Sequence, residues 1–197
     1  MTALVSMHTA LFSRIERADW LLPTLARFLF AAILLVYYWK SGLTKLGDGL
    51  LGLFSPAVGA YAQIFPKATE AVTYDVTKLS LFHHLTVLAG TWAEFILPIL
   101  IIAGLLSRLA SLGMIGFIAV QSLTDLYGHG GIEHEGTLGA WFDKAPDAII
   151  LDQRALWVFL LLVIVVKGAG PLSLDRALSR AVAPFPTSRG RGHRAPL

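Results

Sequence analysis

The sequence lacks cysteine and has few charged residues. The absence of cysteine from its 197 residues excludes a disulfide scaffold, a thiolate metal site and thiol redox chemistry. Charged residues make up 15% of the chain, against about a quarter in a typical soluble domain. Hydrophobic residues make up 55%, and the mean hydropathy is +0.66. This apolar content excludes an intrinsically disordered chain and is typical of an integral membrane protein.

Common catalytic and binding signatures are also missing. The chain has no phosphate-binding loop, dinucleotide fingerprint, nucleophile elbow or haem-attachment motif. Its pI of about 9.3 raises the question of nucleic-acid binding. However, six of the sixteen Lys and Arg residues lie in the last 31 residues, as in a basic tail beside a membrane. We therefore expect the lipid bilayer, and no nucleic acid, as a partner.

Four apolar runs are long enough to cross a membrane. A hydrocarbon core about 30 Å thick needs roughly 20 apolar helical residues. The sequence predicts spans at about residues 21–40, 84–106, 108–127 and 148–167. The fourth run reaches this length only if its helix begins near Ala148 and includes Asp152, Gln153 and Arg154. The predicted fold class is an all-α integral membrane protein, a four-transmembrane-helix bundle.

The segments outside the spans complete the predicted organisation. The first outer loop, residues 41–83, is apolar in patches and too long to be structureless, so we expect one or two short surface helices there. The second outer loop covers residues 128–147. Residues 1–20 form an amphipathic cytoplasmic segment before the membrane domain, residues 21–170. A basic cytoplasmic tail, residues 171–197, follows and includes a short amphipathic helix at about 173–183.

The distribution of positive charge predicts the orientation. An even number of spans places both termini on one side of the membrane. Nine Lys and Arg residues fall on that side, whereas six fall on the other, mostly in long loops where charge constrains orientation less. We therefore expect both termini to be cytoplasmic.

Glu94 is the most informative polar residue, because ionisable groups inside a span are costly. It lies about 14 Å inside the second predicted span and shares a helix face with Gly90 and Pro98. Pro98 has no N–H, so the Glu94 carbonyl loses its intrahelical donor. This combination suits a proton, a cation or a hydrogen-bonding headgroup such as a quinone or a phenol. The alternative is a purely structural polar contact between helices.

Other polar residues fall near the same levels of the bundle. Arg27, in the first span, either reaches the cytoplasmic headgroups or pairs with Glu94. Gln121 and Asp125 lie four residues apart towards the outer end of the third helix. The candidate catalytic residues are therefore Glu94, Arg27, Gln121 and Asp125. Glu94, Trp92 and Gln121 are the candidate cofactor-binding residues, although Trp92 also fits an interfacial aromatic belt.

The outer loops also contain potential metal ligands. The candidates are His83, His84, His129 and His134, whose imidazoles suit zinc or copper(II). No spacing among them matches a known ligand motif. The second outer loop is acidic and attracts cations without specifying a site.

Three segments, taken in order, resemble a known family. They are KSGLTKL at residues 40–46, AEFILPILIIAGLLSRLASLGMIGFIAV at 93–120 and GPLSLDRAL at 170–178. Together they resemble the DoxX family of small four-helix bacterial membrane proteins, which implies a multi-pass protein of the bacterial inner membrane. By the same matching, Glu94 occupies the family's acidic position and Arg108 its turn between the second and third helices.

The resemblance implies a redox setting. Namesake relatives are associated with the membrane subunit of a thiosulfate:quinone oxidoreductase, others with redox-stress complexes, and some occur beside small metal-handling proteins. This chain departs from them in its long first loop and its His- and acid-rich second loop. It also has no cysteine to carry sulfur. These departures argue against a thiosulfate activity.

Three functions follow from these patterns. The preferred one is a quinone-interacting or redox accessory subunit, working with a protein partner or as a homo-oligomer. The second is a metal- or cation-handling or transport protein that uses the His- and acid-rich outer loop. The third is a non-catalytic membrane anchor. No cofactor motif is evident, and a quinone and a metal ion are the ligands that these hypotheses require.

Overall fold

The computed structural model describes residues 2–182, and these residues form helices and no strands. Four continuous helical stretches are long and apolar enough to cross a membrane, which confirms the predicted four-helix architecture. They are Leu21–Leu43, formed by α2 (Leu21–Phe30), η1 (Ala31–Leu35) and α3 (Val36–Leu43); Leu81–Ala103, which is α6; Ser107–Gly128, formed by α7 (Ser107–Leu123) and η4 (Thr124–Gly128); and Ile149–Lys167, formed by η6 (Ile149–Arg154) and α9 (Ala155–Lys167).

Three of these stretches contain a π-helical segment, namely η1, η4 and η6. A π-helical turn carries one residue more than an α-helical turn and is frequent at functional sites. In the described chain, one such segment precedes α3, one ends the third stretch and one begins the fourth.

The turn between α6 and α7 is short because Gly104 ends α6. This glycine has a φ of +71°, a left-handed conformation that a residue with a Cβ adopts at a cost. The N–H of Leu105 then donates to the carbonyl of Leu100, at 3.0 Å. As a result α6 ends at Ala103, three residues before the end of the predicted span.

The fourth stretch begins at Ile149 and includes Asp152, Gln153 and Arg154 in its first turns, as predicted. The carboxylate of Asp152 accepts a hydrogen bond from the backbone N–H of Ala148, at 2.9 Å. This contact satisfies a donor at the start of the helix that would otherwise be unpaired. Arg154, in the same segment, is buried.

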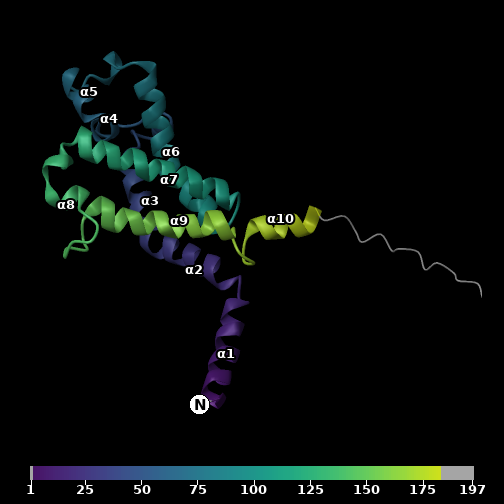
Figure 1. Ribbon diagram of the computed structural model, residues 1–197. Helices are drawn as coiled ribbons and strands as arrows, with labels where there is room; N and C mark the ends of the chain where they lie inside the picture. The colour runs from purple at the N-terminus through teal and green to yellow at the C-terminus, as the bar shows by residue number, and fades with distance from the viewer. Residues whose placement is uncertain (1, 183–197) are drawn as a thin grey trace, which may run out of the picture.

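Short helices fill the first outer loop, as predicted, but there are four helical segments and not one or two. They are η2 (Leu50–Leu53), α4 (Val58–Ile64), α5 (Pro66–Ala71) and η3 (Val76–Lys78). Ala60 and Tyr61 of α4 pack with Val87 of α6 in a small second core. Figure 1 shows α4 and α5 beside α6, at the end of the bundle away from α1 and α10. The second outer loop contains η5 (Gly131–Glu133) and α8 (Glu135–Leu138).

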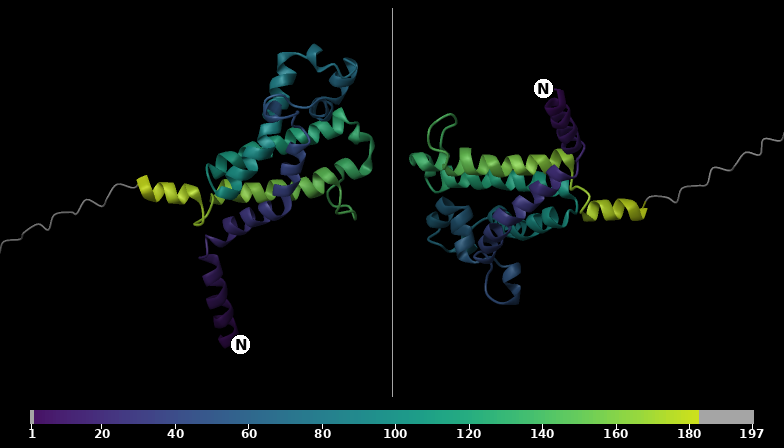
Figure 2. Two further views of the ribbon diagram at one scale, coloured as in Figure 1. Left: turned by 180° about the vertical axis from the view of Figure 1, so that it is seen from behind. Right: turned by 90° about the horizontal axis from the view of Figure 1, so that it is seen from below.

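Two further helices flank the bundle at its other end. α1 (Thr2–Glu16) precedes α2 and has no buried residue. α10 (Leu174–Val182) follows α9 and matches the predicted helix as far as the structure describes it, since residues 183–197 of the predicted tail lie outside the described residues. Figures 1 and 2 show both helices leaving the same end of the bundle. We name this the terminal-helix end.

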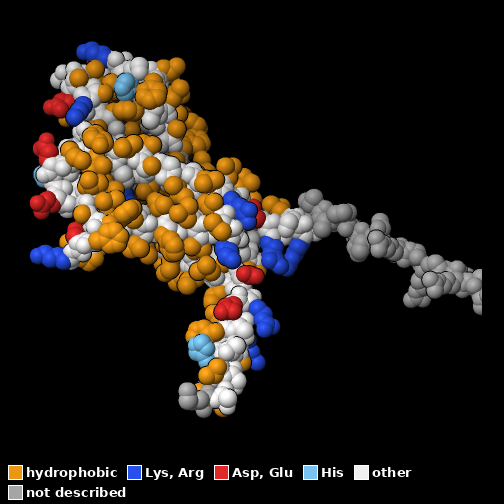
Figure 3. Space-filling view, viewed as in Figure 1, with side chains coloured by type: hydrophobic (Ala, Val, Ile, Leu, Met, Phe, Trp, Pro, Cys, Tyr) orange, Lys and Arg blue, Asp and Glu red, His pale blue; other side chains and the backbone are white. Residues whose placement is uncertain are grey.

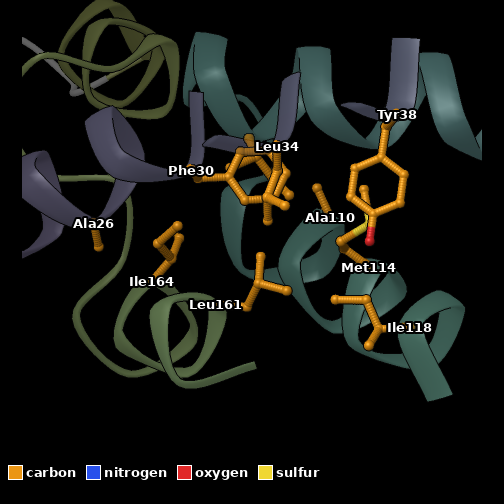
Figure 4. Packing of buried hydrophobic residues seen from close by; sticks show 10 residues of the cluster. Ala26, Phe30, Leu34, Tyr38, Ala110, Met114, Ile118, Leu161 and Ile164 are labelled. Carbon is orange, nitrogen blue, oxygen red and sulfur yellow. The ribbon is translucent and has the colours of Figure 1, made fainter. Parts of the chain in front are cut away.

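In the main core, side chains of the first stretch pack against α7 and α9. Phe30, Leu34 and Tyr38 are fully buried or nearly so and pack with Met114 of α7 and Leu161 of α9 (Figure 4). Apolar side chains also cover the outside of the bundle, and charged side chains gather near its ends (Figure 3). Such a distribution suits a lipid environment around the helices.

Candidate functional site

A cavity of about 520 Å³ lies between α3, α6, α7 and η4, with α4 closing one side. Its walls are mostly apolar or small, and they include Gly90, Ala93, Leu97, Gly116 and Phe117. Polar residues from several elements also line it. They are Tyr37, Ser41, Lys45, Gln63, Thr86, Glu94, Gln121, Thr124 and Asp125. A largely apolar chamber with a few polar groups is typical of a small-molecule site.

The spacing of residues in the first stretch creates one polar wall. Tyr37, Ser41 and Lys45 follow one another at intervals of four and so lie on one face of the chain. Lys45 lies just beyond α3, in a turn where its own backbone N–H donates to the carbonyl of Gly42 at 3.0 Å. A Cβ on Gly42 would lie 2.6 Å from the ring of Phe95, so the glycine lets α3 approach α6 closely.

Lys45 and Glu94 form a buried ion pair at this wall. The ammonium nitrogen Nζ of Lys45 lies 2.9 Å from both carboxylate oxygens of Glu94, and the two residues are 4% and 3% exposed. Ser41 completes the network, because its hydroxyl donates to Glu94 Oε1 at 2.9 Å and accepts from Lys45 Nζ at 2.7 Å. Buried charges need such partners, since their removal from water is costly.

A second polar group lies on α7 and η4. Gln121 Nε2 donates to the Tyr37 hydroxyl at 2.9 Å. Asp125 forms an ion pair of 2.5 Å with Arg154, whose other terminal nitrogen donates to Ser122 Oγ at 3.0 Å. The side-chain oxygen of Gln121 is buried and has no hydrogen-bond partner among the described residues. A buried polar atom without a partner is commonly explained by a water or a ligand.

Arg27 does not take part in this site. Its guanidinium donates instead to backbone carbonyls at the terminal-helix end, those of Ile101, Ile102, Ala169 and Leu172. The last carbonyls of a helix lack intrahelical donors, so the end of α6 attracts this side chain. The alternative in which Arg27 pairs with Glu94 is therefore wrong, and Lys45 takes that place.

Of the other predicted site residues, two line the cavity and one does not. Gln121 and Asp125 line the cavity with Glu94, as their grouping predicted. Trp92 does not line it, because its indole N–H donates to the carbonyl of Leu53 at 2.7 Å and its ring packs on Phe54. Lys45, predicted to lie in the first outer loop, was not predicted to be a site residue, and neither were Ser41, Tyr37 and Arg154. The four-residue spacing of Tyr37, Ser41 and Lys45 was the available signal.

The four histidines have separate surroundings. His83 contacts Ser80 Oγ at 2.8 Å and His129 contacts the carbonyl of Gln63 at 2.9 Å. His84 Nδ1 lies 2.7 Å from the hydroxyl of Tyr61, whose pKa is raised by burial, so the hydroxyl stays protonated. His134 is exposed. Within residues 2–182, no three His, Cys, Asp or Glu side chains are grouped so that they could hold one metal ion.

Comparisons of the chain with protein-family models, with curated proteins and with solved structures find no match. The resemblance to the DoxX family therefore stays a prediction. The chemistry of the cavity has to be inferred from the residues that line it.

Proposed function

We propose that this chain is a DoxX-like, multi-pass protein of the bacterial inner membrane that binds a quinone-type headgroup in the cavity. In this proposal both termini are cytoplasmic, and the protein is an accessory subunit of a redox complex. The observation that carries the proposal is the unpartnered oxygen of Gln121 beside the Tyr37 hydroxyl, in the wall of a mostly apolar chamber. A quinone needs this combination, because its ring is apolar and its oxygens are polar.

The amide of Gln121 suits both redox forms of such a ligand. Its Nε2 has two N–H donors, of which one is used by Tyr37, so the other can donate to a quinone carbonyl. Its unpartnered oxygen is buried, and it can accept a hydrogen bond from the hydroxyl of a quinol when the amide turns toward the cavity. The Tyr37 hydroxyl accepts from Gln121 and keeps its own O–H for a ligand oxygen.

The Lys45–Glu94 pair provides titratable groups in the same cavity. A quinone takes up protons when it is reduced, and a quinol releases them when it is oxidised. The carboxylate of Glu94 can exchange such a proton while Ser41 and Lys45 hold it in position. The chain contains no cofactor motif for electron transfer, so a partner protein has to exchange the electrons.

The cation-handling alternative receives less support from the contacts. Glu94 already binds the ammonium of Lys45, so the pair has no net charge with which to attract a metal ion. Asp125 is likewise paired, with Arg154. The histidines that would collect a cation are bonded to different neighbours.

A cavity-filling variant tests the proposal. A Cβ at Gly116 meets no atom within 4 Å and this residue lines the cavity, so Gly116→Leu fills the chamber without a backbone clash. Gly59 in α4 is equally open but is not a lining residue, so Gly59→Leu is the matched control. We expect decylubiquinone to bind the wild type and Gly59→Leu by isothermal titration calorimetry, and to bind Gly116→Leu at least tenfold more weakly.

Two results would contradict quinone binding. One is the absence of any heat of binding from either decylubiquinone or its quinol, which would favour a membrane anchor. The other is equal affinity in the wild type and in Gly116→Leu. A parallel titration with zinc tests the cation alternative, which predicts binding that Glu94→Gln abolishes.

A further inference from the structure

A second cavity lies at the terminal-helix end. It has a volume of about 380 Å³ and shares no lining residue with the first. Asp19 and Trp20 contribute from the turn between α1 and α2, Lys167 from the end of α9, and Asp175 and Arg176 from α10. The proposed quinone site does not use any of these residues.

The two acidic residues of this cavity, Asp175 and Asp19, differ in how many hydrogen bonds and ion pairs they form. Asp175 accepts hydrogen bonds from the backbone N–H groups of Leu106 and Ser107, at 2.7 and 3.0 Å, and from Ser107 Oγ at 2.8 Å. Burial raises its pKa, but these hydrogen bonds and the charge of Arg27 outweigh that effect, so the net pKa is lowered. Asp175 therefore stays ionised and bound to the start of α7. Asp19 is largely exposed and lies 3.7 Å from Lys167.

The cations of this cavity are less fully neutralised. Lys167 has only the long contact with exposed Asp19, and Arg176 has no carboxylate within 4 Å among the described residues. Arg108 lies close to the end of α9, since its guanidinium donates to the carbonyl of Val166 at 3.4 Å. The terminal helices and the turn after α1 add Arg14, Arg17 and Arg180. Figure 3 shows the Lys and Arg side chains gathered where the terminal helices meet the bundle. This end therefore attracts anions.

α10 adds an apolar face beside these cations. At 100° per residue, Leu174, Ala177, Leu178 and Ala181 share one side of the helix, and Arg176 and Arg180 lie on the other. Leu174 and Leu178 are about half exposed, and α10 extends away from the bundle in Figures 1 and 2. A helix with an apolar face and a basic face suits the surface of an anionic membrane.

We infer that the cavity at the terminal-helix end binds the phosphate of an anionic phospholipid, with α10 lying in the adjacent membrane surface. Lys167 and Arg176 contact the phosphodiester, and Leu174 and Leu178 enter the boundary of the acyl chains. Trp20 lies at the headgroup level that this side chain prefers. Asp19 opposes the binding because its negative charge lies beside Lys167.

The test uses the full chain, purified in mild detergent and stripped of lipid. Dioleoylphosphatidylglycerol is titrated and its binding is measured by native mass spectrometry, with dioleoylphosphatidylcholine as the neutral reference. We expect tighter binding of phosphatidylglycerol. Each lost cation should weaken that binding about fivefold, so the Lys167→Gln, Arg176→Gln double variant should lose at least tenfold.

Two controls separate a specific site from a general effect of net charge. The Lys78→Gln, Lys144→Gln double variant removes the same charge from exposed outer-loop residues, and its binding should equal that of the wild type. Asp19→Asn removes the opposing charge, so its binding should be tighter. Weaker binding by Asp19→Asn, or equal loss in both double variants, would overturn the assignment.

Two further results would identify a different ligand. Equal affinity for the two lipids would refute a preference for anionic headgroups. Competition by millimolar inorganic phosphate would indicate a soluble anion and would overturn the lipid assignment. The outcome is independent of quinone binding, because the two cavities share no residue.

Discussion

Removing one partner of the Lys45–Glu94 pair should destabilise the protein far more than removing both. In Lys45→Met the carboxylate of Glu94 stays buried with only Ser41 as a donor, and in Glu94→Gln the ammonium of Lys45 stays buried without a counter-charge. Breaking a buried pair in this way costs about 3–5 kcal/mol. Replacing both partners with apolar residues is often neutral, so the Lys45→Met, Glu94→Leu double variant should lie close to the wild type.

The assay is thermal unfolding of purified protein in mild detergent, followed by tryptophan fluorescence. For a chain of this size, 1 kcal/mol corresponds to about 2–4 °C in Tm, so each single variant should unfold about 6–20 °C below the wild type. Lys40→Met is the matched control, because Lys40 is an exposed lysine of α3, five residues before Lys45, and its Tm should change by little. Single variants with an unchanged Tm would refute the reasoning, as would a double variant whose loss equals the sum of the two single losses.

Three further predictions concern the terminal-helix end and the orientation. Arg27→Gln should lose several hydrogen bonds to carbonyls and lower the free energy of unfolding by about 1–3 kcal/mol, measured by chemical denaturation. Because the folded-state pKa of Asp175 is lowered, the stability that it contributes is present above its unfolded pKa of about 3.9 and is lost as the pH falls through the folded value. Asp175→Asn should therefore cost about 1 kcal/mol at pH 7 and flatten this acid-dependent fall in Tm. Reporter fusions at Leu197 should be active in the cytoplasm and fusions at Gly136 outside it, whereas a cytoplasmic signal at Gly136 would contradict the proposed orientation.

The sequence was sufficient to predict the number of long helices, since each depends on a local run of apolar residues. It also predicted that the fourth helix includes Asp152, Gln153 and Arg154, because no shorter segment would reach the required length. The short helices of the first outer loop followed from its length and its apolar patches. Each of these properties depends on residues that are neighbours in the sequence, so it can be predicted without knowing how the helices pack.

The partner of Glu94 depends on how the helices cross, which the sequence does not display. Arg27 and Lys45 are 18 residues apart in the first stretch, or about 27 Å along a helix. Their partners in α6, Ile101 and Glu94, are only 7 residues apart, or about 10 Å. The first stretch is therefore inclined to α6. Counting depth from the span ends treats helices as parallel. For that reason Arg27 remained a candidate partner of Glu94, and Lys45, which does lie in a turn beyond α3, was not considered as one.

The π-helical segment η1 sets the rotational phase of the first stretch. Ala26, Phe30, Leu34 and Tyr38 recur every four residues and are all 0–3% exposed. In an ideal α-helix a four-residue repeat turns by about 40° per step, so three steps would carry Tyr38 about 120° away from Ala26. The extra residue in η1 turns the chain back by about 100°, which keeps the buried stripe straight. The same correction brings the next face, with Tyr37, Ser41 and Lys45, to the cavity and to Glu94.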